Sequence, residues 1–511
     1  MDFLEAPPSS QDLGLAALLG LDLPGTQAGG PAFTQMGDPY VRKGGTRVGD
    51  DRLGSPAGGG GARDDLGCRR WFRRRTRGAH AVPASNHKGS EIVHRIAIGI
   101  AVPALGLTAY LATRLSANSA LISYWIFVTA LVAVCLLAFV KGRRFVNYPI
   151  ARGRTLAIIP AYNEPQDKLY ACVRSLLAQT VKPDRIIVMD DGSAEPVVPF
   201  DAPGVEWIRQ PNAGKRGAHV TALRQFHRDE FQFVMTVDSD STPYPDALEH
   251  LLRAMSNKRI QAATGWIYVR NYRESWVARA ADMDIGSSCV MMRASRSMLG
   301  ALETTSGALA LYRSEILYDH LDAYAAECGT GDDRWLTLRA LLRGQVIGVY
   351  EAGVETDMPT GLRGTFRQRL RWSRSWWWML PYAYARLSWK QLISPTVGLI
   401  ELVITPIVLL WTVVAWSVGF QLRLDHPGAL LAFLGAFMVV RITQSVLYLA
   451  GRPGMSMRQK TLSLLIGTPV AAVLSLTLLM PTRYYALTRL RDNRWQTRQI
   501  KPKLKAEAET A

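Results

Sequence analysis

Three short apolar runs in this chain each end in a polar cluster: RTLAIIPAYNE (Arg154–Glu164), RIIVMDDGS (Arg185–Ser193) and FQFVMTVDSD (Phe231–Asp240). Two segments with helical spacing, 167–179 and 215–229, lie between the runs. Continuous apolar strands that alternate with helices predict an α/β fold with a mainly parallel sheet. Ligands bind beyond the carboxyl ends of such strands, and the polar clusters lie at those ends.

Long apolar runs flank this α/β segment on both sides. They lie near 92–113, 119–140, 396–420, 428–450 and 461–482. Each run is long enough to cross a bilayer as a helix. Lys141, Arg143 and Arg144 follow the second run, and basic residues beside a span mark its cytoplasmic end. The pattern predicts a multi-pass protein of the cell membrane whose central domain lies in the cytoplasm between transmembrane helices.

The formal net charge of this 511-residue chain is +18, which raises the question of its partner. Lysine and arginine cluster beside the apolar runs, at 69–77, 141–144, 452–460 and 483–505. Basic residues in such places orient the spans and contact anionic lipid. We therefore expect membrane lipid, and not nucleic acid, as the partner of this charge.

The five cysteines are scattered along the chain, at Cys68, Cys135, Cys172, Cys289 and Cys328. They form no C-x-x-C pair, so neither a structural zinc site nor a disulfide framework is indicated. Their odd number fits reduced thiols in a cytoplasmic compartment. The first 30 residues lack the basic start and apolar core of a signal peptide.

These features divide the chain into predicted regions. They are a disordered N-terminal region (1–90), two transmembrane helices (91–141), the α/β domain (150–365), amphipathic interface helices (366–392), C-terminal transmembrane helices (393–490) and a basic cytoplasmic tail (491–511). The first region is rich in Gly, Pro, Ala and Asp, so it buries too little apolar surface to offset the entropy of ordering. The interface region is rich in tryptophan and tyrosine, a composition typical of a helix at a membrane surface.

Carboxylates follow two neighbouring predicted strands. Asp238 and Asp240 form a D-x-D at a strand end, and Mg²⁺ or Mn²⁺ prefers such oxygen ligands shared with substrate phosphates. The alternative interpretation is a solvated loop end, which can carry the same D-x-D residues. Asp190 and Asp191 could receive ribose hydroxyls or a base N–H, and their alternative role is to cap the turn before Gly192.

The segment Asn212-Ala-Gly-Lys-Arg216 opens a predicted helix. Gly214 lets the backbone approach a ligand, and Lys215 brings positive charge to a phosphate at the helix N-terminus. An ordinary capped helix start is the alternative interpretation.

A second acidic pair, Asp332 and Asp333, begins another predicted helix in the sequence G-D-D-R. Sugar transfer to an alcohol needs a base for the acceptor hydroxyl. One carboxylate can serve as that base while an arginine holds its neighbour. The alternative is a pair of acids that only stabilises the start of the helix.

About 35 residues later, Gln368, Arg371 and Trp372 have the spacing i, i+3, i+4 and so share one helix face. An aromatic platform beside a guanidinium suits a sugar ring or a pyrophosphate. The same letters also fit the apolar face of an interfacial helix.

Taken in order, these motifs resemble those of processive family-2 glycosyltransferases with the GT-A (Rossmann-like) fold, over about 150–378. The most similar groups are the hyaluronan synthases and the NodC-like chitooligosaccharide synthases, which resemble this chain at GDDRWLT (Gly331–Thr337) and RWSRS (Arg371–Ser375). The resemblance implies a role for each matching residue. Tyr162, Glu164 and Asp191 would contact uridine, and Lys215 and Arg216 would lie near the nucleotide phosphates. Asp238 and Asp240 would position UDP and the metal, and Asp333 would be the general base. Gln368, Arg371 and Trp372 would hold the pyrophosphate and the acceptor.

The tail sequence Arg494-Trp-Gln-Thr-Arg498 resembles the W-G-T-R motif of hyaluronan synthases, with Gln496 where that motif has glycine. On this resemblance Trp495 and Arg498 join the predicted substrate-binding residues.

The resemblance implies an inverting hexosyltransferase that polymerises a β-linked polysaccharide from UDP-sugars and extrudes it. UDP-GlcNAc is the favoured donor, and UDP-GlcUA is a second candidate. The alternatives are a chitin-like or other synthase that uses one donor, and a non-processive lipid glycosyltransferase. An inactive nucleotide-sugar binding component is a further class, which the intact acids argue against.

Two features of the apolar runs leave the membrane topology open. Two spans before the domain and three after it would put the basic tail outside the cell, unless a run such as the one interrupted at Gly467-Thr-Pro469 is re-entrant. Arg441, Gln444 and Glu401 lie within the predicted spans, where polar groups face a cavity or pair with each other.

Overall fold

The computed structural model describes residues 145–329, 331–421 and 428–490, together with isolated positions between 126 and 133. By its contacts the chain divides into Met1–Val82 and Pro83–Ala511, and the described residues all belong to the second unit. The predicted disordered region, most of the two N-terminal spans and the tail with Trp495 and Arg498 lie outside the described residues.

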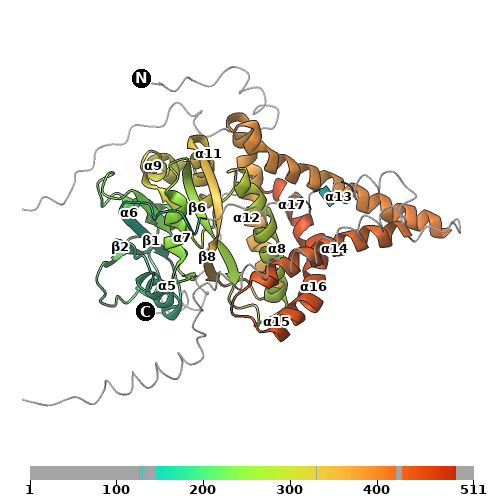
Figure 1. The fold of residues 1–511 in the computed structure, drawn as a ribbon, viewed down its shortest axis with the longest axis horizontal. Coiled ribbons are helices and arrows are strands. Elements are labelled where there is room, and N and C mark those ends of the chain that lie inside the picture. The colour runs from blue at the N-terminus through green and yellow to red at the C-terminus, as the bar shows by residue number, and fades with distance from the viewer. Residues whose placement is uncertain are drawn as a thin grey trace, which may run out of the picture. The chain divides into compact units, whose positions relative to one another are not determined.

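One sheet organises the α/β domain (Figure 1). Among the described residues its order is β3-β2-β1-β4-β7-β6-β8-β5. The strands are β1 (Thr155–Ala161), β2 (Arg185–Asp190), β3 (Val205–Arg209), β4 (Phe233–Thr236), β5 (Thr242–Pro243), β6 (Ile260–Val269), β7 (Ala310–Arg313) and β8 (Gln345–Thr356). The apolar runs recognised in the sequence are β1, β2 and β4, which lie side by side.

The sheet is mixed but mainly parallel, as expected: four of the seven strand pairs among the described residues are parallel, including β6 with β8. Strands β3, β2, β1 and β4 pair in parallel, as the alternation of strands and helices predicted. Strand β7 then pairs antiparallel with both β4 and β6, and β5 pairs antiparallel with β8. A local pattern reveals that a segment is a strand, but it does not reveal the direction in which β7 pairs with its neighbours.

Side chains of β1 alternate between two apolar layers. Ala157 and Ile159 pack with α5 (Gln166–Leu177) and α7 (Ala247–Met255), while Leu156 and Ile158 pack with α6 (Gly214–Leu223) and α11 (Asp332–Arg343) on the other face. These strand residues are fully buried. A strand buried on both faces reads as a continuous apolar run, which is why β1 was recognisable in the sequence.

Further helices complete the domain. They are α8 (Trp276–Met298), α9 (Ser314–Tyr318), α10 (Leu321–Ala326) and α12 (Leu362–Arg386). Helix α12 carries the Q-R-L-R-W sequence and packs against α11 and against α17 (Met480–Leu487), the last helix among the described residues (Figure 1). The predicted interface segment, 366–392, contains α12 from residue 366 onward and the first residues of α13 (Trp389–Gln421).

The C-terminal part consists of apolar helices. Helix α13 is Trp389–Gln421 and α14 is Gly428–Gly451. Helices α15 (Met457–Leu462), α16 (Thr468–Leu474) and α17 (Met480–Leu487) are joined by the π-helical turns η1 (Ser463–Gly467) and η2 (Ser475–Leu479). The expected interruption at Gly467-Thr-Pro469 therefore does not end the helix, which widens there and continues.

Within the described part of the chain, the stretches Trp389–Trp411 and Met457–Leu487 are long and apolar enough to cross a membrane. The apolar stretch of α14, Phe437–Gly451, is shorter. Three C-terminal crossings were expected from the sequence, and these residues support two of them by length and composition.

Helix α8 joins the α/β domain to the C-terminal helices. It packs against α14 and α16, and its buried Asp282 accepts a hydrogen bond from Tyr448 at 2.7 Å. Asp284, in the same helix, lies 2.8 Å from Arg369 of α12 and 3.5 Å from Arg441 of α14. The charge of Arg441 is thus paired within the protein. Pairing was one of the two alternatives expected for polar groups in the apolar runs.

The packing of α11 can be tested with two leucines of the same helix. Leu338 is 4% exposed and Leu342 is 44% exposed. Leu338→Ala should destabilise the fold by about 2–5 kcal/mol because it leaves a cavity beneath α12, whereas Leu342→Ala should change stability by less than about 0.5 kcal/mol. Thermal unfolding of the purified full-length chain measures both, and equal shifts in Tm would contradict the assignment of the buried face.

Candidate active site

Acids from distant parts of the chain meet at Lys215, in the first turn of α6. Its Nζ lies 2.7 Å from Oδ1 of Asp238, which follows β4, and 3.1 Å from Oδ2 of Asp332, which begins α11. Burial alone would lower the pKa of Lys215, but the two carboxylates outweigh burial and hold that pKa well above its ordinary value. Lys215 is therefore a permanent positive charge that joins the two acidic segments.

The adjacent acids of α11 differ in their ionisation. Burial would raise the pKa of Asp332, but the Lys215 ammonium outweighs it and the pKa is lowered. For Asp333, burial and the negative charge of Asp332 both raise the pKa. Asp332 thus stays ionised, while Asp333 can exchange a proton closer to neutral pH, as a general base does. The cation that holds Asp332 is a lysine, where the sequence had suggested an arginine.

Two glycines make this close packing possible. A Cβ added at Gly307 would lie 2.9 Å from Asp238 Oδ2 and 3.1 Å from Lys215 Nζ. Gly331 has a φ of 108°, and a Cβ there would overlap with the Ser375 side chain of α12. Position 331 needs glycine for its backbone conformation as well as for space, whereas a side chain at position 307 would displace the Lys215–Asp238 contact. The segment that contains Gly307, before β7, and the segment that contains Gly331 therefore bring β7 and α12 against the acids.

The acids at the end of β2 organise neighbouring loops. Asp190 accepts hydrogen bonds from the Ser193 amide and from Arg209 Nη1, both at 2.9 Å. Asp191 accepts one from Gln210 Nε2 at 2.7 Å and one from the Ala213 amide at 2.9 Å. These are capping contacts of the kind considered as the alternative to ligand binding. They fix the loop before α6, and a role of either acid in binding a nucleoside stays a prediction.

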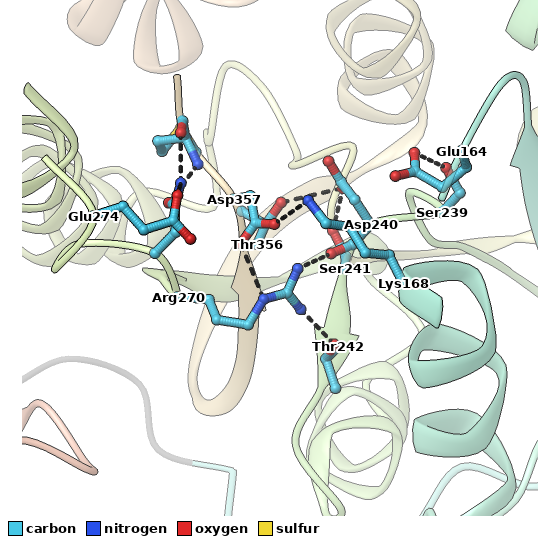
Figure 2. A network of polar contacts seen from close by, with 12 residues as sticks. Glu164, Lys168, Ser239, Asp240, Ser241, Thr242, Arg270, Glu274, Thr356 and Asp357 are labelled. Carbon is cyan, nitrogen blue, oxygen red and sulfur yellow. Dashed lines mark hydrogen bonds and ion pairs between the residues drawn. The ribbon is translucent and has the colours of Figure 1, made fainter. Parts of the chain in front are cut away.

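The cluster at the end of β1 lies beside the D-x-D loop. Glu164 accepts a hydrogen bond from Ser239 Oγ at 3.0 Å, as Figure 2 shows. Asn163 has a left-handed backbone, with a φ of 49°, and its Oδ1 accepts from the Ala194 amide at 2.8 Å. This strained turn places the neighbouring Tyr162, which is half-buried, at the same edge of the sheet.

Arg270 is the main support of the D-x-D loop, and its role was missed in the sequence. Figure 2 shows its guanidinium between the loop and Asp357. It donates to the Asp240 carbonyl and to Thr242 Oγ1, each at 2.8 Å, and its Nε lies 3.0 Å from Asp357 Oδ1. Lys168 of α5 contacts the other Asp357 oxygen at 2.7 Å. An acid directly after an apolar strand, as Asp357 is after β8, was the available signal.

The donor set at the end of β4 fits a divalent cation that arrives with a diphosphate. In residues 145–329, 331–421 and 428–490, no group of three or more His, Cys, Asp or Glu side chains gathers to hold a metal. Asp238 and Asp240 supply two carboxylates, and Mg²⁺ is commonly held by one or two carboxylates plus substrate phosphates. The predicted pair thus provides the type of ligand that such a cation needs, although Asp238 contacts Lys215 in this structure.

The Q-R-L-R-W residues belong to α12, which packs against the acid-bearing helix α11. The Arg371 guanidinium contributes to lowering the pKa of Asp332, after the larger effects of burial and Lys215. Arg369, which was not singled out in the sequence, stacks on the Trp372 ring at 4.6 Å and pairs with Asp284. Gln368 Nε2 donates to Met358 Sδ at 3.5 Å. Trp372 is 36% exposed, so part of its ring is accessible.

Arg216 lies next to Lys215 but acts on another neighbour. Burial and the charge of Asp332 raise the pKa of the Cys328 thiol, and the Arg216 guanidinium opposes them. The structure thus gathers Lys215, Asp238 and Asp332 into one contact set, with Arg216 at its edge.

Comparisons with known proteins agree with this geometry. The family "Glycosyl transferase family 2" matches residues 156–321. A hyaluronan synthase of Streptococcus pyogenes is 29% identical over 377 residues, which cover 68% of this chain and 83% of the relative. An N-acetylglucosaminyltransferase of Rhizobium sp. (strain N33) is 30% identical over 358 residues, which cover 67% of this chain and 76% of the relative. The resemblance drawn from the motifs is therefore confirmed.

Among solved structures, a mannosyltransferase of Pyrobaculum calidifontis in complex with GDP-Man and Mn²⁺ covers 76% of this chain, at 16% identity and a TM-score of 0.41. That degree of likeness does not bear on the individual residues of the site. The mixed sheet and the family match indicate a GT-A-like glycosyltransferase fold. Together with the extent of the similarity to the Rhizobium enzyme, they show that this chain belongs to glycosyltransferase family 2.

Proposed function

We propose that this chain is a membrane-embedded, processive and inverting transferase that adds sugars from UDP-sugar donors to a growing β-linked polysaccharide. The observation that carries the proposal is the contact of Lys215 with both Asp238 and Asp332. It couples the strand-end acid that would meet the donor diphosphate to the acid pair that would act on the acceptor.

In this proposal Asp333 is the general base. Its carboxylate takes the proton of the acceptor hydroxyl, whose oxygen forms a bond to the anomeric carbon from the face opposite the leaving group. The bond from that carbon to the β-phosphate oxygen breaks, and its electron pair leaves with UDP. Lys215 and Arg371 provide positive charge for the developing phosphate charge, and such preorganised charges stabilise transition states strongly. Attack from the opposite face inverts the anomeric configuration.

A divalent cation, Mg²⁺ or Mn²⁺, would be held by Asp238 and Asp240 and would supply Lewis-acid stabilisation of the diphosphate when bound. Arg270 would keep Asp240 in place for that purpose through its hydrogen bond to the backbone carbonyl. Tyr162, Glu164 and Asp191 remain the residues proposed to contact uridine, at the neighbouring strand ends.

The similarity to a hyaluronan synthase and to an N-acetylglucosaminyltransferase supports UDP-GlcNAc as a donor, since both products contain that sugar. UDP-GlcUA is the second donor if the product is hyaluronan. A synthase that uses UDP-GlcNAc alone is the second candidate function. The Rhizobium N-acetylglucosaminyltransferase supports this candidate, and at 30% identity it is as similar to this chain as the hyaluronan synthase is.

Extrusion of the product would need the C-terminal helices in a bilayer. The exposed side chains of α13 include Val403, Ile407 and Leu410, which are 57%, 59% and 66% exposed. Apolar surface of this kind on a long helix suits contact with lipid. We propose that these helices, with the predicted N-terminal spans, anchor the enzyme in the cell membrane and pass the polymer outward.

The donor is tested first with purified full-length protein, Mg²⁺ or Mn²⁺, and three conditions: UDP-GlcNAc alone, UDP-GlcUA alone, and both. High-mass product only with both donors, degraded by hyaluronidase, is the expected result for a hyaluronan synthase. Polymer from UDP-GlcNAc alone would establish the second candidate. An absence of UDP release in all three conditions would contradict the proposed donors.

The base is tested by Asp333→Asn, which keeps the shape of the side chain and removes its ability to accept a proton. We expect sugar transfer to fall about 10²- to 10⁴-fold, the usual contribution of a general base. Asp322→Asn is the matched control, because that carboxylate is 92% exposed and pairs with the exposed Arg224, the residue after α6. Transfer by Asp333→Asn at the wild-type rate would refute the assignment.

The pH profile provides a separate test of the acid pair. A base must be ionised, and the raised pKa of Asp333 means that activity is lost on acidification at a higher pH than an ordinary aspartate would give. Asp332→Asn removes the neighbouring negative charge, so the acidic limb of kcat/KM should move to lower pH. A limb that stays in place would show that another group titrates.

A further inference from the structure

Glu303 is a buried carboxylate outside the acid pair, in the segment between α8 and β7. Only 7% of the residue is exposed. Its oxygens contact side chains of several helices: Arg296 Nη2 of α8 at 3.3 Å, Arg334 Nη1 of α11 at 3.6 Å, Trp376 Nε1 of α12 at 3.2 Å, and Ser394 Oγ of α13. Glu303 is thus the point at which the domain, the Q-R-L-R-W helix and the first apolar C-terminal helix meet.

The charge balance keeps Glu303 ionised. Burial would raise its pKa, but the guanidinium groups of Arg296 and Arg334 outweigh burial and lower it. A buried carboxylate is tolerated only when it is paired and hydrogen-bonded in this way. Arg334 likewise needs a partner, because its side chain is only 15% exposed, and Glu303 is a carboxylate that pairs with its guanidinium.

Arg334 connects Glu303 to the proposed base. The Arg334 amide donates a hydrogen bond to Asp333 Oδ1 at 2.8 Å. The side chain of the same residue is held by Glu303, so both ends of Arg334 are fixed. On the side of α12, Trp376 donates to Glu303 next to Ser375, the residue that packs against Gly331. Glu303 therefore holds both helices that enclose the acid pair.

We propose that Glu303 is a positioning residue for sugar transfer: it holds Arg334 and Trp376 so that Asp333 keeps its place relative to the acceptor on α12. The inference rests on the proposed function of Asp333 as base. Through Ser394 the same carboxylate links the position of the acids to helix α13. Donor binding is not expected to depend on Glu303, because Lys215 and Asp238 do not contact it.

This role has a specific consequence for catalysis. If Glu303 is lost, Asp333 is misplaced relative to the acceptor hydroxyl, and small displacements of a catalytic group cost up to about 10²-fold in rate. Water is small and mobile, so it can still reach the anomeric carbon of a bound donor. Sugar transfer should therefore fall more than donor hydrolysis, while the KM for the donor stays the same.

The test is Glu303→Gln in the full-length protein, with UDP release and polymer formation measured together. We expect the kcat for transfer to fall by about 10- to 100-fold, the donor KM to stay within about twofold, and the ratio of hydrolysis to transfer to rise. Asp282→Asn is the matched control: it also neutralises a buried carboxylate that pairs with an arginine, Arg452, but at the joint with α14. Its ratio of hydrolysis to transfer should equal that of the wild type.

A wild-type ratio in Glu303→Gln, or a loss of transfer that merely follows Tm as it does in Asp282→Asn, would overturn the inference and leave the proposed function intact. A wild-type protein that transfers no sugar would overturn both. If Glu303→Gln does not fold, Trp376→Phe removes one hydrogen bond to Glu303 and retains an aromatic ring. It should raise the same ratio to a smaller extent, and an unchanged ratio would likewise count against the inference.

Discussion

The contact of one lysine with two carboxylates is the interaction on which the site depends. Lys215 is largely buried, at 17% side-chain exposure, and Asp332 is 9% exposed. Removal of one member of such a buried pair costs about 3–5 kcal/mol because an uncompensated charge remains. The start of α6, the end of β4 and the start of α11 are therefore tied to one another by charge as well as by packing. A side chain at position 307 would press on that contact, because a Cβ there would lie 2.9 Å from Asp238 Oδ2 and 3.1 Å from Lys215 Nζ.

Much of this arrangement could be predicted from the chain alone, for a physical reason. Strands buried on both faces are continuous apolar runs, so β1, β2 and β4 could be recognised and the acids that follow them assigned to one edge of the sheet. Asp238, Asp332 and Lys215 were each selected for their own local setting. Their mutual contact could not be predicted, because it depends on how α11 returns to the sheet about 115 residues after Lys215.

The rest of the site was hidden because partners far apart in sequence carry no local signature. The residues next to Arg270 do not indicate that its guanidinium holds the D-x-D loop, since the available signal lay at its distant partner Asp357. Glu303 lies in a segment without periodicity. The antiparallel β7 was missed for the same reason, because it pairs with β4 and β6, which lie far from it in the sequence. Local patterns thus identified the ends of strands and helices, while the support of the acids is a property of the tertiary fold.

A lysine suits the centre of this site better than an arginine would. Its ammonium is a compact charge with three donors on a flexible stem, whereas a guanidinium presents a rigid planar fork. In the proposed reaction, a donor diphosphate and its cation would compete for Asp238. The Lys215 ammonium could then redirect one of its N–H groups from Asp238 to a phosphate oxygen while it keeps Asp332 ionised. The same residue would thereby connect the sugar donor to the acid pair, because burial and the negative charge of Asp332 raise the pKa of Asp333 and the charge of Lys215 lowers it.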